Sequence, residues 1–337
     1  MRMRQEFTYL NRPISAGGKT IKNRIAVPAM ADFGMTEKDG LVNQRHLERY
    51  GAYAEGGAGL VIIEACAVSK LEEPRNTIGV YEDGCMDGLK RLAEAAKKNG
   101  AAALVQLMNT GLSAMPYSSI AEIPEQEFKQ YHDDFIQAAI RCQKAGFDGA
   151  ELHAAHGMYL NRVIETSTRT DGYGGAFENR IRLLRELICE IRETCGSGFL
   201  LAVRFGNRDP EELVQTAQVI QEAGGDLLDV STGMGSYINV PPSFAFDGKL
   251  YAASLVKQKS DLPVIGVGNI FTGEQAEQAL EEGLADMIAV GRGHLADPAW
   301  AGKVLSGENP VPCRRCRRCL WYVDGRKCPA ARERREQ

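Results

Sequence analysis

The sequence lacks the features that would place a chain in a membrane or export it. Its 337 residues contain no stretch of about 18 uninterrupted apolar side chains, so we expect no membrane-spanning helix. The N-terminal segment, MRMRQEFTYL, has no apolar core of the kind that a secretory signal requires. We therefore expect a cytoplasmic protein.

A strong excess of charge of one sign is also missing. The chain has 40 Lys and Arg against 44 Asp and Glu, a formal net charge of −4. This balance gives no general attraction to nucleic acid or to a membrane surface, so neither is an expected partner. Cysteine is too scarce for a disulfide scaffold, because nine residues in a chain this long cannot dominate its folding.

Eight short apolar segments alternate with helix-like segments, and the hydrophobic fraction of 44% can fill a large core. The apolar segments are residues 24–30, 59–65, 102–107, 149–153, 200–204, 226–230, 263–267 and 286–290. Regular alternation predicts a parallel sheet, and eight units predict a closed (β/α)8 TIM barrel of the α/β class. Residues 7–22, with Gly17-Gly18 at the turn, predict a hairpin that caps the barrel. We assign the barrel to residues 1–305 and a short Cys-rich tail to residues 306–337.

Several predicted strands end in polar side chains, which would meet at the C-terminal rim of the barrel, where such folds keep their chemistry. Gln106, His153 and Arg204 stand at three of these ends. His156 follows His153 by three residues, next to Gly157, and two histidines this close can grip one oxygen atom. A zinc pair is less favoured, because a helical pair is usually spaced i, i+4 and needs further ligands.

Glycine-bearing turns follow the last two predicted strands. They contain Gly268-Asn269 and Gly291-Arg292. Bare backbone N–H groups and a cation after the seventh and eighth strands predict a phosphate site. The glycine spacing is not G-x-G-x-x-G, so we expect no dinucleotide-binding fold here.

Taken in order, these segments resemble the Old Yellow Enzyme family of FMN-dependent ene-reductases, and within it the barrel domain of 2,4-dienoyl-CoA reductase. The matching segments are NRIAVPAM at 23–30, Glu64-Ala65, Gln106-Leu107, AGFDGAELHAAHG at 145–157, RTDGYGGAFENR at 169–180, Arg204, VGNI at 267–270 and AVGRGHLADP at 289–298.

The resemblance implies an FMN site made of strand ends and turns. Its residues would be Pro28, Ala29 and Met30 along the flavin ring, Ala65, Gln106 and Arg204 at the pyrimidine edge, and Gly268, Asn269, Gly291 and Arg292 at the phosphate. A cation such as Arg204 near the pyrimidine edge would stabilise the reduced flavin's negative charge.

The resemblance also implies a reaction. His153 and His156 would bind the carbonyl oxygen of a small enone or enoate, and Tyr159 would lie near the position of a proton donor. The implied activity is reduction of the activated C=C bond by hydride from the flavin. Two alternatives stay open: a flavin-dependent amine dehydrogenase of the trimethylamine dehydrogenase type, and a non-enzymatic barrel whose tail is a zinc ribbon that binds nucleic acid.

Four cysteines lie close together in the tail: Cys313, Cys316, Cys319 and Cys328. Four thiolates can hold zinc or an iron–sulfur cluster, and they can also hold no metal at all. The resemblance favours a 4Fe-4S cluster directly after the barrel. Larger relatives continue into flavin- and nicotinamide-binding domains that this sequence does not contain. We therefore expect electrons from NAD(P)H bound at the FMN, from a separate protein or from a partner subunit; the oligomeric state stays open.

Overall fold

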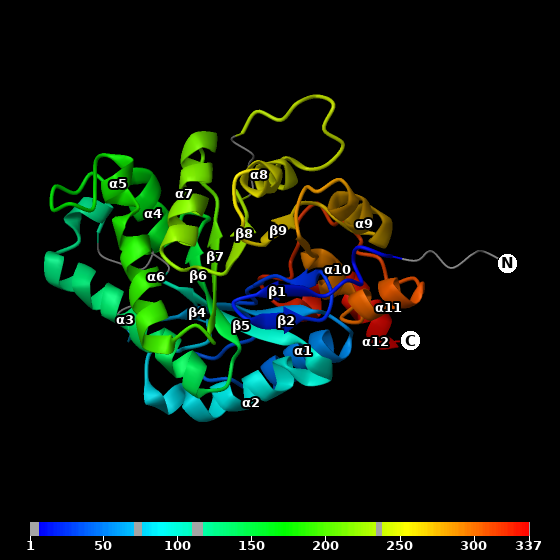
Figure 1. The fold of residues 1–337 in the computed structure, drawn as a ribbon. Helices are drawn as coiled ribbons and strands as arrows, with labels where there is room; N and C mark the ends of the chain where they lie inside the picture. Colours follow the sequence, from blue (N-terminus) through cyan, green and yellow to red (C-terminus); the bar gives the residue numbers. More distant parts are fainter. Residues whose placement is uncertain (1–6, 71–75, 110–116, 234–237, 337) are drawn as a thin grey trace.

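Eight parallel strands close into a barrel at the centre of the computed structural model, which describes residues 7–70, 76–109, 117–233 and 238–336. The strands follow one another around the barrel in the order β10-β3-β4-β5-β6-β7-β8-β9 (Figure 1). They are β3 (Ile25–Val27), β4 (Leu60–Ala67), β5 (Ala102–Met108), β6 (Gly149–Ala154), β7 (Leu200–Phe205), β8 (Leu227–Val230), β9 (Val264–Val267) and β10 (Met287–Ala289). The predicted (β/α)8 barrel is confirmed.

Each predicted apolar segment overlaps one of these strands. The largest difference is in the first segment, predicted as 24–30 and observed as Ile25–Val27. Pro28 has no N–H with which to continue a ladder, so the chain leaves the sheet there and runs onto the rim.

Helices cover the outside of the barrel (Figure 1). They are α1 (Gln44–Glu55), α2 (Met86–Ala96), α3 (Glu125–Lys144), α4 (Tyr159–Thr166), α5 (Phe177–Arg180), α6 (Arg182–Cys195), α7 (Pro210–Glu222), α8 (Gly248–Lys257), α9 (Gly273–Glu281), α10 (Gly291–Ala296), α11 (Trp300–Ser306) and α12 (Pro329–Glu336). Local sequence sets several starts: Asn43 and Thr272 close capping boxes, and Asp209 caps α7 with Pro210 in its first turn. In the described ranges, no helix is both long and apolar enough to cross a membrane.

The predicted hairpin is confirmed. Strands β1 (Ile14–Ala16) and β2 (Lys19–Ile21) pair antiparallel around Gly17 and Gly18, whose φ values of 53° and 71° suit glycine. Ala16 and Ile21 are buried in one apolar cluster with Leu60 and Leu200 from the early parts of the barrel strands. The hairpin therefore closes the end of the barrel opposite the rim.

Side-chain alternation along the strands decides what the barrel interior contains. Ala102 and Leu104 of β5 belong to the interior cluster, whereas Ala103 and Val105 belong to the larger core beneath the helices. The next interior position on β5 is Gln106. The apolar filling therefore gives way to polar side chains as the strands approach the rim.

Candidate functional site

A cavity of about 380 Å³ opens at the C-terminal ends of the strands; we call it the rim cavity. Its lining combines strand ends with residues of the Cys-rich tail: Pro28, Ala29, Met30, Ala31, Arg204, Val267, Gly268, Asn269, Ile270, Ala289, Gly291, Arg292, Leu295, Cys319, Trp321 and Tyr322. Eight of the ten residues predicted to bind a cofactor are among them. Ala65 and Gln106 are not, and both are buried.

One end of the rim cavity is built to receive an anion. Asn269 adopts a left-handed backbone conformation, with φ of 48°, that non-glycine residues rarely occupy. Its side chain is held from both sides, by Arg292, which donates to Asn269 Oδ1, and by Asp247, whose carboxylate accepts from Asn269 Nδ2 at 2.5 Å. A strained conformation fixed by two partners is typical of ligand sites.

Two cations flank this end. The guanidinium of Arg292 lies 4.7 Å from the centre of the Phe271 ring, and that of Arg315, from the tail, lies 4.3 Å from it. Gly291 packs so closely that an added Cβ would stand 3.2 Å from Met30 Sδ. Of the two, only Arg292 lines the cavity, and a guanidinium group beside the glycine turn at Gly291 suits a phosphate.

Beside the cavity, a polar layer crosses the inside of the barrel from β5 to β8. Gln106 Nε2 donates to Glu151 Oε1 at 2.7 Å, and Arg204 Nε lies 3.4 Å from Asp229 Oδ2. Arg204 Nη1 also donates to the Ala29 carbonyl at 3.3 Å. Burial raises the pKa of Glu151 to about 8 and also raises that of Asp229.

Sequence reasoning missed Glu151 and Asp229, although a signal was present. Each is a lone acid inside a strand that is otherwise apolar or small, and both are fully buried. A charged residue in such a strand requires a partner, which the neighbouring strands supply.

The two predicted histidines come together. His153, the last but one residue of β6, is the register partner of Arg204, and its ring centre lies 5.1 Å from that of His156. Neither histidine is among the residues that line the rim cavity. His156 has φ of 61°, and its Nε2 lies 2.8 Å from Ser231 Oγ. Burial lowers the pKa of His153, and the surrounding protein lowers the pKa of His156 although that side chain is exposed at the surface; the charge of Arg204 adds to both effects. Both rings are therefore neutral near pH 7 and can each donate one N–H.

Tyr159 lies elsewhere. It is the first residue of α4, its ring packs against Phe128 and Tyr131 of α3, and it is not among the residues that line the rim cavity. Its hydroxyl has no hydrogen-bond partner in the described part of the chain, and burial raises its pKa well above the usual value. The contacts of Tyr159 are thus with aromatic side chains of α3, and its place near the proton-donor position stays a prediction.

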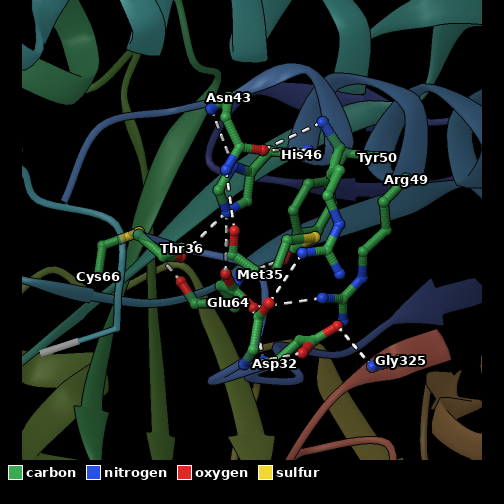
Figure 2. A network of polar contacts seen from close by, with 12 residues as sticks. Asp32, Met35, Thr36, Asn43, His46, Arg49, Tyr50, Glu64, Cys66 and Gly325 are labelled. Atoms are coloured by element: carbon green, nitrogen blue, oxygen red, sulfur yellow. Dashed lines mark hydrogen bonds and ion pairs between the residues drawn. The ribbon is translucent and has the colours of Figure 1, made fainter. Parts of the chain in front are cut away.

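The tail is fastened to the rim by a buried network, shown in Figure 2. Asp32 accepts from the backbone N–H of Gly325 at 2.9 Å and from that of Gly34 at 3.1 Å. The backbone also pairs directly, since Phe33 N–H donates to the Tyr322 carbonyl at 3.0 Å. The segment that carries Trp321 and Tyr322 is therefore held in place against the β3–α1 loop.

Arg49 joins this network to the rim cavity. It donates to the Met30 carbonyl at 2.6 Å and to Glu64 Oε2 at 3.3 Å, and its guanidinium lies 5.1 Å from the Trp321 ring. Glu64 in turn accepts from the Asp32 N–H at 3.0 Å. One buried cation therefore contacts both Met30 and Trp321, two walls of the same cavity.

All four tail cysteines line a second cavity, of about 320 Å³, which we call the cysteine cavity. Cys319, Trp321 and Arg292 line both cavities, so the two share a wall. Within the described ranges, no group of three or more His, Cys, Asp or Glu side chains is arranged to hold a metal ion. The four thiols therefore line one cavity without forming a group that holds a metal ion, and the predicted cluster site stays a prediction.

Comparison with known proteins agrees with this architecture. The model of the NADH:flavin oxidoreductase / NADH oxidase family matches residues 9–122 and 117–310. An NADH oxidase of Thermoanaerobacter brockii is 34% identical over 92% of this chain and 52% of its own length. The 2-naphthoyl-CoA reductase structure, in complex with 2-naphthoyl-CoA, has a TM-score of 0.84 and 25% identity, over 94% of this chain and 55% of that one.

An old yellow enzyme homologue from Zymomonas mobilis has a TM-score of 0.76 at 25% identity, over 94% of this chain and 98% of that one. The chain spans about half the length of the first two of these proteins. The family resemblance predicted from the sequence is confirmed: this chain belongs to the NADH:flavin oxidoreductase / NADH oxidase family.

Proposed function

We propose that this chain binds FMN in the rim cavity and reduces the activated C=C bond of a small α,β-unsaturated carbonyl compound. Bound FMN would take a hydride from NAD(P)H and deliver it to the substrate. The observation that supports the proposal is a cavity at the strand ends with glycine turns and Arg292 at one end and the buried cation Arg204 in its wall, beside a histidine pair whose first member is the register partner of Arg204.

The residues present fit FMN. Arg292, with the glycine turns at Gly268 and Gly291 that line the cavity, would hold the phosphate through its charge and through backbone N–H groups. Pro28, Ala29 and Met30 would pack on the ring. Arg204 would bring a positive charge to the pyrimidine edge, with Gln106 and Ala65 beside it.

His153 and His156 would act on the substrate. Both are neutral near pH 7 for the reason given above, so each would donate an N–H to the same carbonyl oxygen. Donors aimed at an oxygen that gains negative charge lower the barrier, because they need not reorganise during the reaction. Ser231, within 2.8 Å of His156 Nε2, would fix the orientation of that ring. We leave the proton donor unassigned, since Tyr159 packs against α3.

We further propose that Cys313, Cys316, Cys319 and Cys328 hold a 4Fe-4S cluster in the cysteine cavity. The support is their common cavity and the wall that it shares with the rim cavity. Burial raises the pKa of the Cys328 thiol, and a cluster's positive iron would reverse that effect, since ligation requires the thiolate.

The tail also offers a surface for an electron-donor protein. Phe33, Leu320, Tyr322 and Val323 are large apolar residues that are 38–46% exposed, and Phe33 pairs with Tyr322 through the backbone. Exposed arginines, among them Arg317 and Arg318, lie on the same segment. Apolar anchors with a basic rim suit an acidic redox protein, so we propose one as an electron source besides NAD(P)H.

The test is a spectrum followed by turnover. Protein purified without oxygen should show flavin absorbance, lose it with NADH or NADPH, and regain it on addition of cyclohexenone. Trimethylamine should not reduce the oxidised flavin. Reduction by the amine without reoxidation by the enone would replace the ene-reductase proposal with an amine dehydrogenase. A protein without flavin after reconstitution with FMN would contradict both.

A further inference from the structure

Four polar side chains form a continuous row across neighbouring strands of the barrel. Gln106 on β5 is the register partner of Glu151 on β6, and Arg204 on β7 is the partner of Asp229 on β8. Glu151 and Asp229 lie two residues apart in register on either side of β7, and the charge of Asp229 acts on the carboxyl group of Glu151, which connects the two pairs. All four side chains are buried, with 0–8% of their surface exposed.

If Glu151 and Asp229 were both ionised, several buried polar atoms of these side chains would have no hydrogen-bond partner. Glu151 Oε2, both carboxylate oxygens of Asp229 and Arg204 Nε are buried without a hydrogen-bond partner among the described residues. A buried polar atom without a partner costs about 1–3 kcal/mol, and a charged one costs more. One proton on Glu151 Oε2 changes this, because that O–H can donate to Asp229. Arg204 Nε, 3.4 Å from Asp229 Oδ2, then faces the one ionised acid.

The balance of charges also indicates one bound proton among these four side chains. The groups that face Glu151 are Gln106 from β5, Arg204 from β7 and Asp229 from β8, while His153 on the same strand is neutral near pH 7. Two carboxylates against one guanidinium would leave a net negative charge buried in the barrel. One bound proton balances the row, and the raised pKa of Glu151, about 8, agrees with it.

We propose that Glu151 is a positioning residue that stays a neutral carboxylic acid in the folded protein. Its O–H donates to Asp229, and its carbonyl oxygen accepts from Gln106 Nε2. Because Nε2 of Gln106 donates to Glu151, the orientation of the Gln106 amide is fixed, and Oε1 of Gln106 remains free to accept a hydrogen bond. The proton also leaves Arg204 with a single counter-charge.

A neutral Glu151 has two consequences for the cofactor site, and both rest on the proposed function. Gln106 would present its oxygen, and not its NH2 group, to an N–H of the flavin edge. Arg204 would keep enough positive charge to favour the reduced, anionic flavin. An ionised Glu151 would weaken that charge.

The decisive variant is Glu151→Gln, since an amide keeps both hydrogen bonds of a neutral acid and cannot ionise. We expect its FMN affinity and flavin reduction potential at pH 6.5 to match those of the wild type. Above about pH 8 the wild type should lose affinity as Glu151 ionises, while Glu151→Gln should not. Glu151→Leu, which removes the partner of Gln106, should weaken FMN binding about tenfold. A higher potential in Glu151→Gln at pH 6.5 would mean that Glu151 is ionised there, and would overturn the proposal.

A second measurement needs no flavin. The pKa of Glu151 is raised on folding, from 4.5 to about 8, so the wild type should lose stability as the pH rises across that window. Glu151→Gln should remove that loss, and Asp229→Asn, which takes away the ionised partner of Arg204, should destabilise at every pH. Equal pH dependence in wild type and Glu151→Gln would contradict the proposal even if FMN binds. Failure of both proteins to bind FMN, with the stability difference present, would contradict only the proposed function.

Discussion

The backbone N–H of Gly325 donates a 2.9 Å hydrogen bond to Oδ2 of Asp32, across 293 positions of sequence. Asp32 stands in the loop that leaves the first barrel strand, and Gly325 belongs to the Cys-rich tail. The contact is tight, because a Cβ on Gly325 would come within 2.7 Å of the Asp32 oxygen. The tail is thereby held where its residues form walls of the rim cavity.

We predict that Asp32→Asn loosens the tail. An amide offers one acceptor where the carboxylate offers two, so the N–H of Gly325 or Gly34 loses its partner, at about 1–3 kcal/mol. Trypsin should cleave the arginine-rich tail faster in this variant. Asp39→Asn, in an exposed part of the same loop, is the control. Equal cleavage of all three proteins would show that the contact does not hold the tail.

Arg204→Ala should weaken FMN binding and slow flavin reduction by NAD(P)H. The change removes the buried cation that we place at the flavin and leaves Asp229 without its ion-pair partner. Arg204→Lys keeps a charge and should retain more of both properties. Flavin occupancy and stopped-flow reduction rates measure the effect, and wild-type values in Arg204→Ala would remove the residue from the site.

Cys316→Ser should lower iron and labile sulfide together and leave FMN bound, because the barrel strands do not depend on the tail thiols. Cys189→Ser is the matched control, since Cys189 lies on α6 and does not line the cysteine cavity. Iron analysis of anaerobically purified protein gives the readout. Zinc in place of iron, or no metal in the wild type, would contradict the cluster.

His153→Ala and His156→Ala should each slow reduction of an enone by roughly 10²–10³, the usual loss for one donor at a developing oxyanion. Flavin content and flavin reduction by NAD(P)H should stay near wild type. The double variant should lose less than the product of the two, because both groups act on one oxygen. Tyr159→Phe should change the rate little, since its hydroxyl lies against α3. Full enone activity in the double variant would make the histidines structural.

Acid should destabilise the protein through its buried histidines. Burial lowers the pKa of His294 from 6.5 to about 4, so the unfolded chain binds more protons in that window and stability falls as the pH drops through it. The loss from this one group is about 3 kcal/mol by pH 4, at about 1.4 kcal/mol for each pKa unit. Melting temperatures between pH 4 and 7 should therefore fall less steeply in His294→Gln. His132→Gln, nearer the surface on α3, should keep the wild-type slope.

The sequence by itself determined the barrel, because hydrophobic alternation and turn residues are local properties of the chain. Residues 149–153 predict a strand with His153 at its end, and β6 runs from Gly149 to Ala154. The family resemblance, which rests on motifs along the chain, named eight of the sixteen residues that line the rim cavity. They meet because, in a (β/α)8 barrel, residues that follow strands lie at one rim. Tyr159 could not be placed, since a difference of one position on a helix turns a side chain by about 100° and sends it to another face.

Only the tertiary structure decided which distant groups meet. Glu151 and Asp229 are acids 78 positions apart, and closure of the barrel is what brings β6 and β8 to either side of β7, so that the two buried carboxyl groups interact. The docking of the tail on Asp32, and the contact of Arg49 with both Met30 and Trp321, likewise join segments that share no local pattern. Local sequence determines where each helix and strand forms. A polar group that is buried in the folded protein needs a hydrogen-bond or charge partner, and the packing of the whole chain determines which group that partner is.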